Sequence, residues 1–303
     1  MKNAKKIVIS AALLLVAVGG LMTAAAAVRG DFDMENRKGL SYEMNTFEVK
    51  EAFSDIYVED AECSVRILRA ADGNCKVVCP DKQDGSIHHT VTVSDGVLSV
   101  RCHDERKWYQ YIGVSFGIPD VEVYLPEKEY GQLAFHTTAG NIQVAEGFSF
   151  ESASLESNSG SIRMYSEVKK ELKAESTSGD ITIENAAPET LAAKSGSGRI
   201  ALSHIRSGEI TARSTAGEIE LTDVVAEKSL YAKSSNGGVA LDGCDGGTIR
   251  IETTSGSVRG TILSDKIFIA DSTSGSIKIP RSSMGGECEI TTTSGSIAIE
   301  IKQ

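Results

Sequence analysis

Hydrophobic and polar residues alternate in a pattern that recurs about every twenty residues from residue 137 to the C-terminus. Each copy is centred on a glycine, and an apolar residue follows that glycine by two positions in every copy. In all but one copy a second apolar residue follows by four positions, so alternate residues share one face of a short strand. The glycines are 19 or 20 residues apart and are Gly140, Gly160, Gly179, Gly198, Gly217, Gly237, Gly256, Gly275 and Gly295.

A second strand precedes each glycine. In the third copy, Leu172 and Ala174 stand seven and five positions before Gly179, and every copy has an apolar residue at both places. Three positions before the glycine the residue is Ser or Thr in all nine copies, as in Ser176. We expect this hydroxyl to point inward and to bond backbone groups of its own coil or the next. We expect the glycine to supply a positive φ at the corner.

A fixed period near twenty residues is typical of a repeat fold in which each unit buries its apolar face against its neighbours. An antiparallel meander of hairpins is the competing all-β interpretation. Hairpins favour two-residue Asn-Gly or Asp-Gly turns, whereas most of these corners read Ser/Thr-x-Ser-Gly. The pattern therefore predicts a parallel β-solenoid of about nine 19–20-residue coils over residues 131–303, with a length of roughly 40 Å.

The N-terminus predicts export. Three lysines among the first six residues precede an uncharged run over residues 7–28, which is long enough to span a bilayer as a hydrophobic helix. Small residues at 23–27 also suit cleavage by a signal peptidase. Residues 1–29 are thus a transmembrane anchor, with the rest of the chain extracytoplasmic, or a cleaved signal of a secreted protein. Residues 30–46 are predicted to be a polar spacer.

Residues 47–130 lack the repeat but keep short alternating segments, such as 63–67 and 121–125, separated by Asp-Gly turns. An open solenoid end exposes core and unpaired strand edges, so terminal repeats need a cap. We predict that this β-rich region caps the N-terminal end, either as irregular first coils or as a separate domain. The last coil, with its final strand over residues 299–303, shows no cap of its own.

An exported hydrophobic segment, a β segment of the type Ser64-Val65-Arg66-Ile67, and serial Thr-Ser-Gly-x-Ile-x-Ile repeats resemble one known family. This is the bacterial "putative adhesin" family of β-strand-repeat proteins, a domain of unknown function. The resemblance covers about residues 46–303. It implies a right-handed β-solenoid on the outer side of a membrane, and it brings no catalytic motif, cofactor or metal.

Four of the six cysteines lie in the leading region, and they are Cys63, Cys75, Cys79 and Cys102. In an oxidising compartment they are candidates for two disulfides, and the alternative is four small buried thiols. Together with His88, His89 and His103 they offer only one closely spaced pair of ligands, which is not the spacing of a structural zinc site. No metal is predicted from this spacing.

An aromatic cluster lies between the predicted cap strands. It consists of Trp108, Tyr109, Tyr111 and Phe116. Tyr and Trp rings combine an apolar body with a polar group, so they are common on apolar surfaces that contact water. The segment is therefore a candidate partner-binding loop. The alternative is a hairpin that packs on the first coil.

The net charge and the distribution of charged residues argue against some classes of function. The net charge of −11, with no basic run after the N-terminal lysines, disfavours nucleic-acid binding. The outward position four residues before each glycine forms a stripe that is acidic, then basic, then acidic along one wall. It reads His136, Glu156, Glu175, Lys194, Arg213, Lys233, Glu252, Asp271 and Thr291.

A solvated face explains this stripe better than a catalytic groove does, and no nucleophile or phosphate-loop motif is present in the sequence. We therefore predict a non-enzymatic scaffold or adhesin-like binding protein of the cell envelope, with an envelope protein or a glycan as partner. Two alternatives stay open. One is an accessory or sensory domain of an envelope-stress system that binds another membrane protein, and the other is a glycan-acting β-helix enzyme.

Overall fold

The computed structural model describes residues 42–106 and 117–302. Within those two ranges the regular structure is entirely β, and no helix there could cross a membrane. The predicted anchor at residues 7–28 and the aromatic cluster of Trp108, Tyr109, Tyr111 and Phe116 lie outside the described residues.

The strands of the leading region are β1 (Tyr42–Val49), β2 (Asp55–Asp60), β3 (Val65–Arg69), β4 (Cys75–Lys82), β5 (Ile87–Ser94), β6 (Val97–Asp104) and β7 (Val121–Leu125). The strands of the repeat region are β8 (Glu129–Thr137), β9 (Ile142–Val144), β10 (Ser149–Ser157), β11 (Ile162–Met164), β12 (Glu167–Ser176), β13 (Ile181–Glu184), β14 (Thr190–Ser195), β15 (Ile200–Ser214), β16 (Ile219–Ser234), β17 (Val239–Thr253), β18 (Val258–Ile262), β19 (Lys266–Ser272), β20 (Ile277–Lys278), β21 (Gly286–Thr292) and β22 (Ile297–Ile301).

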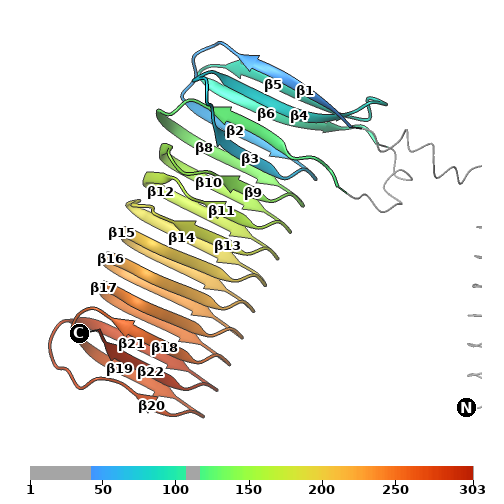
Figure 1. Cartoon of the computed structure of the whole chain (residues 1–303). Helices are drawn as coiled ribbons and strands as arrows, with labels where there is room; N and C mark the ends of the chain where they lie inside the picture. The colour runs from blue at the N-terminus through green and yellow to red at the C-terminus, as the bar shows by residue number, and fades with distance from the viewer. Residues whose placement is uncertain (1–41, 107–116, 303) are drawn as a thin grey trace, which may run out of the picture.

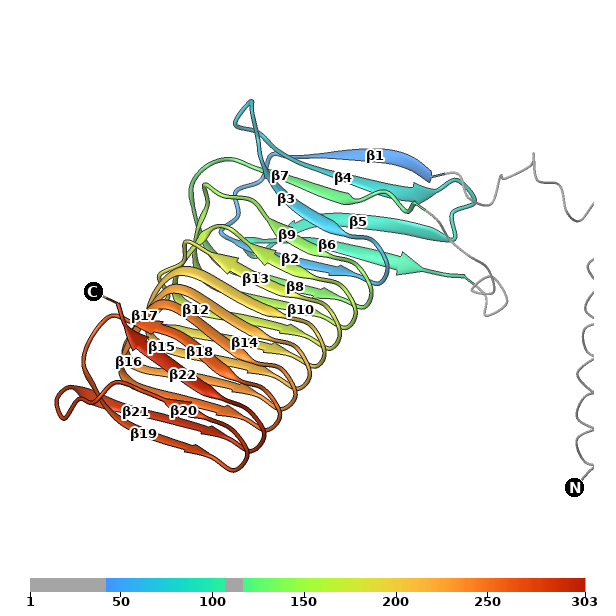
Figure 2. The same cartoon turned by 60° about the horizontal axis from the view of Figure 1, so that its bottom comes forward.

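Parallel pairing between successive repeats confirms the β-solenoid. On one wall Leu155 of β10 pairs with Phe135 of β8 and with Ala174 of β12, each at the same position of its repeat. On the other wall β11 pairs in parallel with β9 and β13. Figures 1 and 2 show the two walls as stacked strands joined by corners at both sides. The antiparallel meander is therefore wrong for the repeat region.

The core lies between the two walls and consists of the inward residues that the alternation predicts. Ile162 and Met164 of β11 face Leu172 of β12, and all three are fully buried. Alanine occupies five of the nine positions five residues before the corner glycine, so the middle of the core is thin. At the capped end it is thicker, because the Tyr130 ring stacks 5.7 Å from the ring of Phe150.

The leading region adds two coils, and they are not in sequence order. Ile56 of β2 pairs in parallel with Leu133 of β8, and Val65 of β3 pairs with Ile142 of β9, so the β2–β3 coil lies directly against the first repeat. The later β6–β7 coil lies outside it, parallel to both strands. Strand β5 then pairs antiparallel with β6, and β4 with β7 and β1, which closes this end.

The C-terminal end also departs from sequence order. Ile249 of β17 pairs with Cys288 of β21, and Cys288 pairs in turn with Phe268 of β19. Strand β22 likewise lies between β18 and β20. The last repeat is thus inserted before the one that precedes it, and Figure 2 shows β19 and β20 at the far end. The coil of β19 and β20, and not the last strand in the sequence, therefore forms the outer edge at this end of the described solenoid.

Candidate functional site

At most corners a hydroxyl bridges two coils. The Ser176 hydroxyl donates to the carbonyl oxygen of Gly160 in the previous coil at 3.1 Å, and it accepts from the Gly179 N–H at 2.8 Å. Ser195 makes the same pair of bonds with Gly179 and Gly198. The predicted inward hydroxyl is confirmed, and the bonds satisfy buried backbone groups that the corner would otherwise leave unpaired.

The reason for the corner glycines differs from our expectation. None of the nine has a positive φ, although other glycines of the described residues do. A Cβ at Gly160 would instead collide with the carbonyl oxygen of Gly140, and one at Gly179 with that of Gly160. At Gly140 the collision would be with the carbonyl of Cys63 in the β2–β3 coil. The glycines are therefore required because the backbones of neighbouring coils approach closely.

The charged stripe forms a shallow groove over the first coils of the repeat region. The groove has a volume of about 270 Å³, and its outward side chains come from β8, β10, β12 and β14 or from the corners after them. Parallel register puts Glu156 directly beside His136 and beside Glu175. The lining residues are His136, Glu156, Ser157, Asn158, Glu175, Ser176, Thr177, Lys194 and Gly196.

A lysine stabilises the anionic form of Glu156 in the groove. The Lys173 ammonium donates to Glu156 at 2.8 Å and lies 3.6 Å from Glu175. Its hydrogen bond, together with the nearby His136, lowers the pKa of Glu156 below its ordinary value. Hydrogen bonding to the charged form of a carboxyl group favours that form. At neutral pH the groove thus presents hydrogen-bond acceptors, not proton donors, at Glu156.

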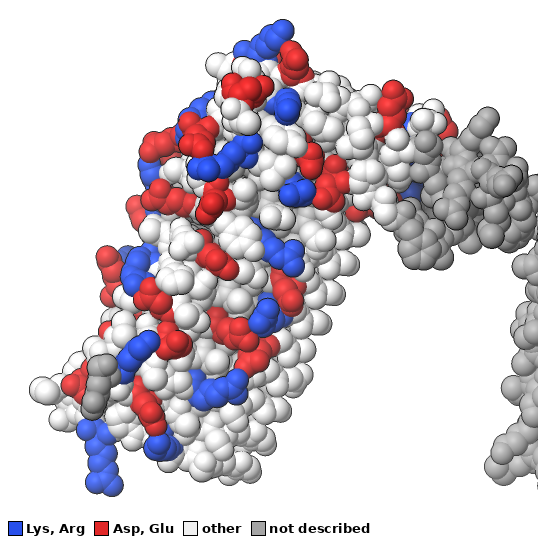
Figure 3. Space-filling view, viewed as in Figure 1, with Lys and Arg blue, Asp and Glu red and all other residues white. Residues whose placement is uncertain are grey.

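Toward the C-terminal end the stripe continues with ion pairs at Glu252, one between coils and one within β17. The Lys233 ammonium lies 2.8 Å from Glu252, and Arg250 lies 2.7 Å from the same carboxylate. The lysine bond lowers the pKa of Glu252. Figure 3 shows acidic and basic side chains interspersed over the face in view. This matches the solvated face that the sequence predicts, since opposite charges meet along the wall.

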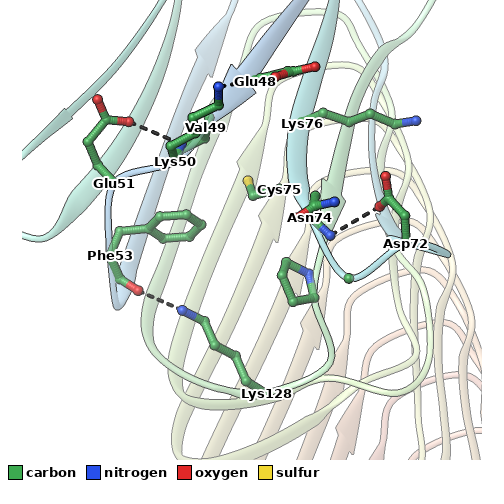
Figure 4. Close-up of a pocket in the computed structure, with 12 residues that line it drawn as sticks. Glu48, Val49, Lys50, Glu51, Phe53, Asp72, Asn74, Cys75, Lys76 and Lys128 are labelled. Carbon is green, nitrogen blue, oxygen red and sulfur yellow. Dashed lines mark hydrogen bonds and ion pairs between the residues drawn. The ribbon is translucent and has the colours of Figure 1, made fainter.

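A second recess, of about 480 Å³, lies at the capped end between the β1–β4 ribbon and the turn before β8 (Figure 4). Its three lysines already have partners. Lys128 donates to the carbonyl of Phe53 at 2.8 Å, Lys76 lies 4.6 Å from the Tyr124 ring centroid, and Lys50 lies 3.7 Å from a glutamate oxygen. All three cations of this recess thus have a contact within the protein.

The four cysteines of the leading region do not gather at one point. Cys75 lines the recess of Figure 4, whereas Cys63 and Cys102 line a small crevice near the end of β2. All six cysteines are free thiols in the structure, so the two predicted disulfides stay a prediction. Burial raises the pKa of Cys63 to about 11 and that of Cys79 to about 12, which keeps both thiols protonated.

The histidines of the leading region lie on two different faces of the β5–β6 ribbon. The rings of His88 and His103 stack on the outer face of the β5–β6 ribbon with centroids 5.0 Å apart. His89 points inward, where it meets two residues that the sequence pattern did not single out, Asp60 and Asp81. Those carboxylates come from β2 and β4. No local motif marks them, since only the fold brings them to His89.

Two overlapping segments, residues 53–192 and 186–303, match the model of a family described as Toastrack DUF4097. The chain belongs to this family. Toastrack DUF4097 is a domain of unknown function, so membership of the family gives the fold without a chemistry. It confirms the resemblance that the repeats indicated. No curated protein is similar enough to this Toastrack chain to count as a match.

Solved structures resemble the Toastrack chain at low identity. A "putative adhesin" from Parabacteroides distasonis is 12% identical, covers 85% of this chain and 97% of its own, and has a TM-score of 0.55. A "putative adhesin" from Bacteroides fragilis is 15% identical over 86% and 99%, with a TM-score of 0.45. A "putative lipid binding protein" from P. distasonis is 14% identical over 85% and 97%, with a TM-score of 0.42. The first of these shows a shared fold.

Proposed function

We propose that this protein is a non-enzymatic scaffold of the cell envelope that binds glycan along its solenoid wall. Residues 7–28 would hold it in the membrane, or direct its secretion if they are cleaved, with the solenoid outside the cytoplasm. The names of the structural neighbours agree with a surface scaffold. The observation that carries the proposal is the groove formed by His136, Glu156, Glu175 and Lys194.

The geometry of the groove suits a polymer with repeating hydroxyl groups. Adjacent coils are about 4.8 Å apart, so side chains at one position of the repeat form a regular row. The Glu156 carboxylate is held ionised by Lys173, and the exposed amide of Asn158 lies at the corner beside it. A carboxylate accepts hydrogen bonds, and an amide both donates and accepts them. Sugar hydroxyls, which also donate and accept, can therefore bond to both groups.

The same groove is poorly suited to glycoside hydrolysis. That reaction needs one carboxylic acid whose pKa is raised so that it can protonate the leaving group. Glu156 has the opposite shift, because Lys173 and His136 stabilise its anion. This supports binding without turnover and counts against the alternative of a glycan-acting enzyme at this place.

The test is glycan binding by the full chain purified in mild detergent. Soluble fragments of cell-wall glycan are titrated into the protein by calorimetry. The groove variant Asn158→Ala/Glu175→Ala removes two polar contacts, each of which contributes about 1 kcal/mol in a typical exposed site. We expect its affinity to fall at least tenfold. The matched control is Arg163→Ala, an exposed residue of β11 on the opposite wall, and it should bind like the parent chain.

The parent chain can contradict the proposal in two ways, and the control variant in a third. One is that no glycan binds, while the chain retains a membrane protein from solubilised envelope, which would favour the accessory or sensory role. The other is release of shortened glycan after incubation, which would restore the enzyme alternative. A loss of binding in Arg163→Ala equal to that in the groove variant would move the contact away from the groove.

A further inference from the structure

A buried group of polar side chains lies where β5 and β6 pack over the turn after β2. His89 belongs to β5, Asp60 ends β2 and Cys63 follows it in the turn. The side chains of His89 and Asp60 are 1% and 2% exposed, and Cys63 is 3% exposed. One imidazole nitrogen, one carboxylate oxygen and one thiol sulfur lie within 4.8 Å of one another. Three kinds of metal ligand thus converge in the interior.

The turn itself fixes two of these ligands. Asp60 Oδ1 accepts hydrogen bonds from the backbone N–H groups of Glu62 at 2.9 Å and Cys63 at 2.7 Å. These bonds hold the carboxylate still and bring the Cys63 side chain to the same side of the turn. The second oxygen, Oδ2, lies 2.9 Å from Nε2 of His89. One oxygen of Asp60 therefore organises the turn, and the other faces the histidine.

The remaining ring nitrogen of His89 is held by another carboxylate. Nδ1 lies 2.7 Å from Asp81 Oδ1, which also accepts from the backbone N–H of His89 at 2.9 Å. The other oxygen of Asp81 accepts from the Asn45 amide at 2.7 Å. Histidines that bind metals usually donate their second N–H to a carboxylate in this way, which fixes the ring and directs Nε2 at the metal.

Cys102 supplies a second sulfur. It is the direct partner of His89 across the β5–β6 ribbon, so the two side chains lie on the same face of that ribbon. Together with Asp60 and Cys63 it lines a small crevice at this end of the cap. Cys102 is half-buried there, whereas Cys63 is buried.

We propose that Asp60, Cys63 and His89, with Cys102 as fourth ligand, form a structural zinc site that joins the antiparallel cap to the first coils of the solenoid. A set of one nitrogen, one oxygen and two sulfur ligands suits Zn²⁺, which binds all three donor types in four-coordinate tetrahedral sites. The ligands come from β2, β5 and β6 and from the turn after β2, so the ion would tie segments that are adjacent only in the folded chain.

The formal charge of the site changes by no more than one unit when zinc binds. Without metal, both ring nitrogens of His89 face carboxylate oxygens, so both carry protons, and with Asp60 and Asp81 the formal charge is −1. Zn²⁺ displaces the Nε2 proton of His89 and the thiol proton of Cys63, and both protons leave to solvent. The sum of +2 for zinc and −1 each for Asp60, Asp81 and the Cys63 thiolate is again −1. Coordination by Cys102 releases a third proton to solvent, and the complete four-ligand site then has a formal charge of −2.

The test uses the full chain purified in mild detergent with its thiols reduced. After incubation with zinc chloride and dialysis, we expect one zinc per chain by elemental analysis. Co²⁺ in place of zinc should give the near-ultraviolet charge-transfer absorption of a cobalt–thiolate bond. The Cys63→Ser/Cys102→Ser variant should lose both signals. The Cys75→Ser/Cys288→Ser variant, which removes two buried thiols outside the cluster, should keep them.

Asp81, which holds Nδ1 of His89, allows a test in which zinc binding is weakened but not abolished. Asp81→Asn should weaken zinc binding about 10- to 100-fold without changing the stoichiometry, because it only positions His89. Circular dichroism shows whether each variant has kept the β fold. Failure of the parent chain to retain zinc would overturn the proposal, as would thiol counting that finds Cys63 and Cys102 joined in a disulfide in the purified protein. Retention of zinc by a folded Cys63→Ser/Cys102→Ser variant would overturn it as well.

Discussion

Replacement of Gly179 by alanine tests why the corners need glycine. Gly179 has no positive φ, so an explanation from backbone conformation predicts little cost. The added Cβ would instead collide with the carbonyl oxygen of Gly160, and that carbonyl accepts the hydroxyl of Ser176. Relief of the collision requires the two coils to separate or the corner to move. Either movement would disturb the bonds of Ser176 to Gly160 and to the Gly179 N–H.

The expected cost follows from these contacts. Overpacking of a tight site costs about 1–3 kcal/mol, and each of the two hydrogen bonds of Ser176 contributes about 0.5–1.5 kcal/mol. We therefore expect Gly179→Ala to lower the free energy of unfolding by about 2–6 kcal/mol. Gly85 is the matched control, since its φ is +73° and no atom lies within 4 Å of an added Cβ. There alanine meets only the backbone penalty, about 1–2 kcal/mol.

Urea unfolding at equilibrium, followed by circular dichroism, measures both variants against the parent chain. The midpoint should fall further for Gly179→Ala than for Gly85→Ala. A repeat array can unfold in parts, so the two variants are compared only where the slope of the transition is unchanged. If Gly179→Ala is no more destabilising than Gly85→Ala, close backbone approach is not the reason for the corner glycines.

Two further predictions concern the corner hydroxyl and the groove. Ser176→Ala should cost about 1–3 kcal/mol, because it leaves the Gly179 N–H and the Gly160 carbonyl without their partner, whereas Ser176→Thr should be close to neutral in the same urea assay. Threonine already occupies this position in three other repeats. In an NMR titration the pKa of Glu156 should lie below its ordinary value of 4.5 and should rise in Lys173→Ala. The contribution of this ion pair to stability is present above pH 4.5 and is lost as the pH falls through the lowered pKa, so the variant should lose less stability on acidification.

Residue alternation within the repeats predicted most of the solenoid. The inward positions around Gly179, namely Leu172, Ala174, Ile181 and Ile183, are all buried as the pattern requires. Parallel pairing could be predicted because the apolar residues stand at the same positions in every repeat. A shift of one residue in the pairing would turn these core residues outward. The same register placed Glu156 beside Glu175, so the groove could be anticipated as a stripe.

Other features depend on contacts that alternation does not encode. The repeats of Ala270 and Ile290 have the same pattern, so nothing in it distinguishes the outermost coil from the inserted one. The cluster around His89 was missed because its side chains come from several strands of the cap, and only the pairing of β5 with β6 and the path of β2 bring them together. Asp60 lies on no repeat and in no recognised ligand spacing.

The inserted position of the last coil changes how the chain resists a pull on its C-terminus. Ile297 of β22 pairs with Val258 of β18 on one side and with Ile277 of β20 on the other. A force along β22 therefore has to shear hydrogen bonds on both edges together, whereas an outermost strand would peel from one edge, bond by bond. A tether or fusion that continues the chain from β22 would thus be held by two neighbouring coils.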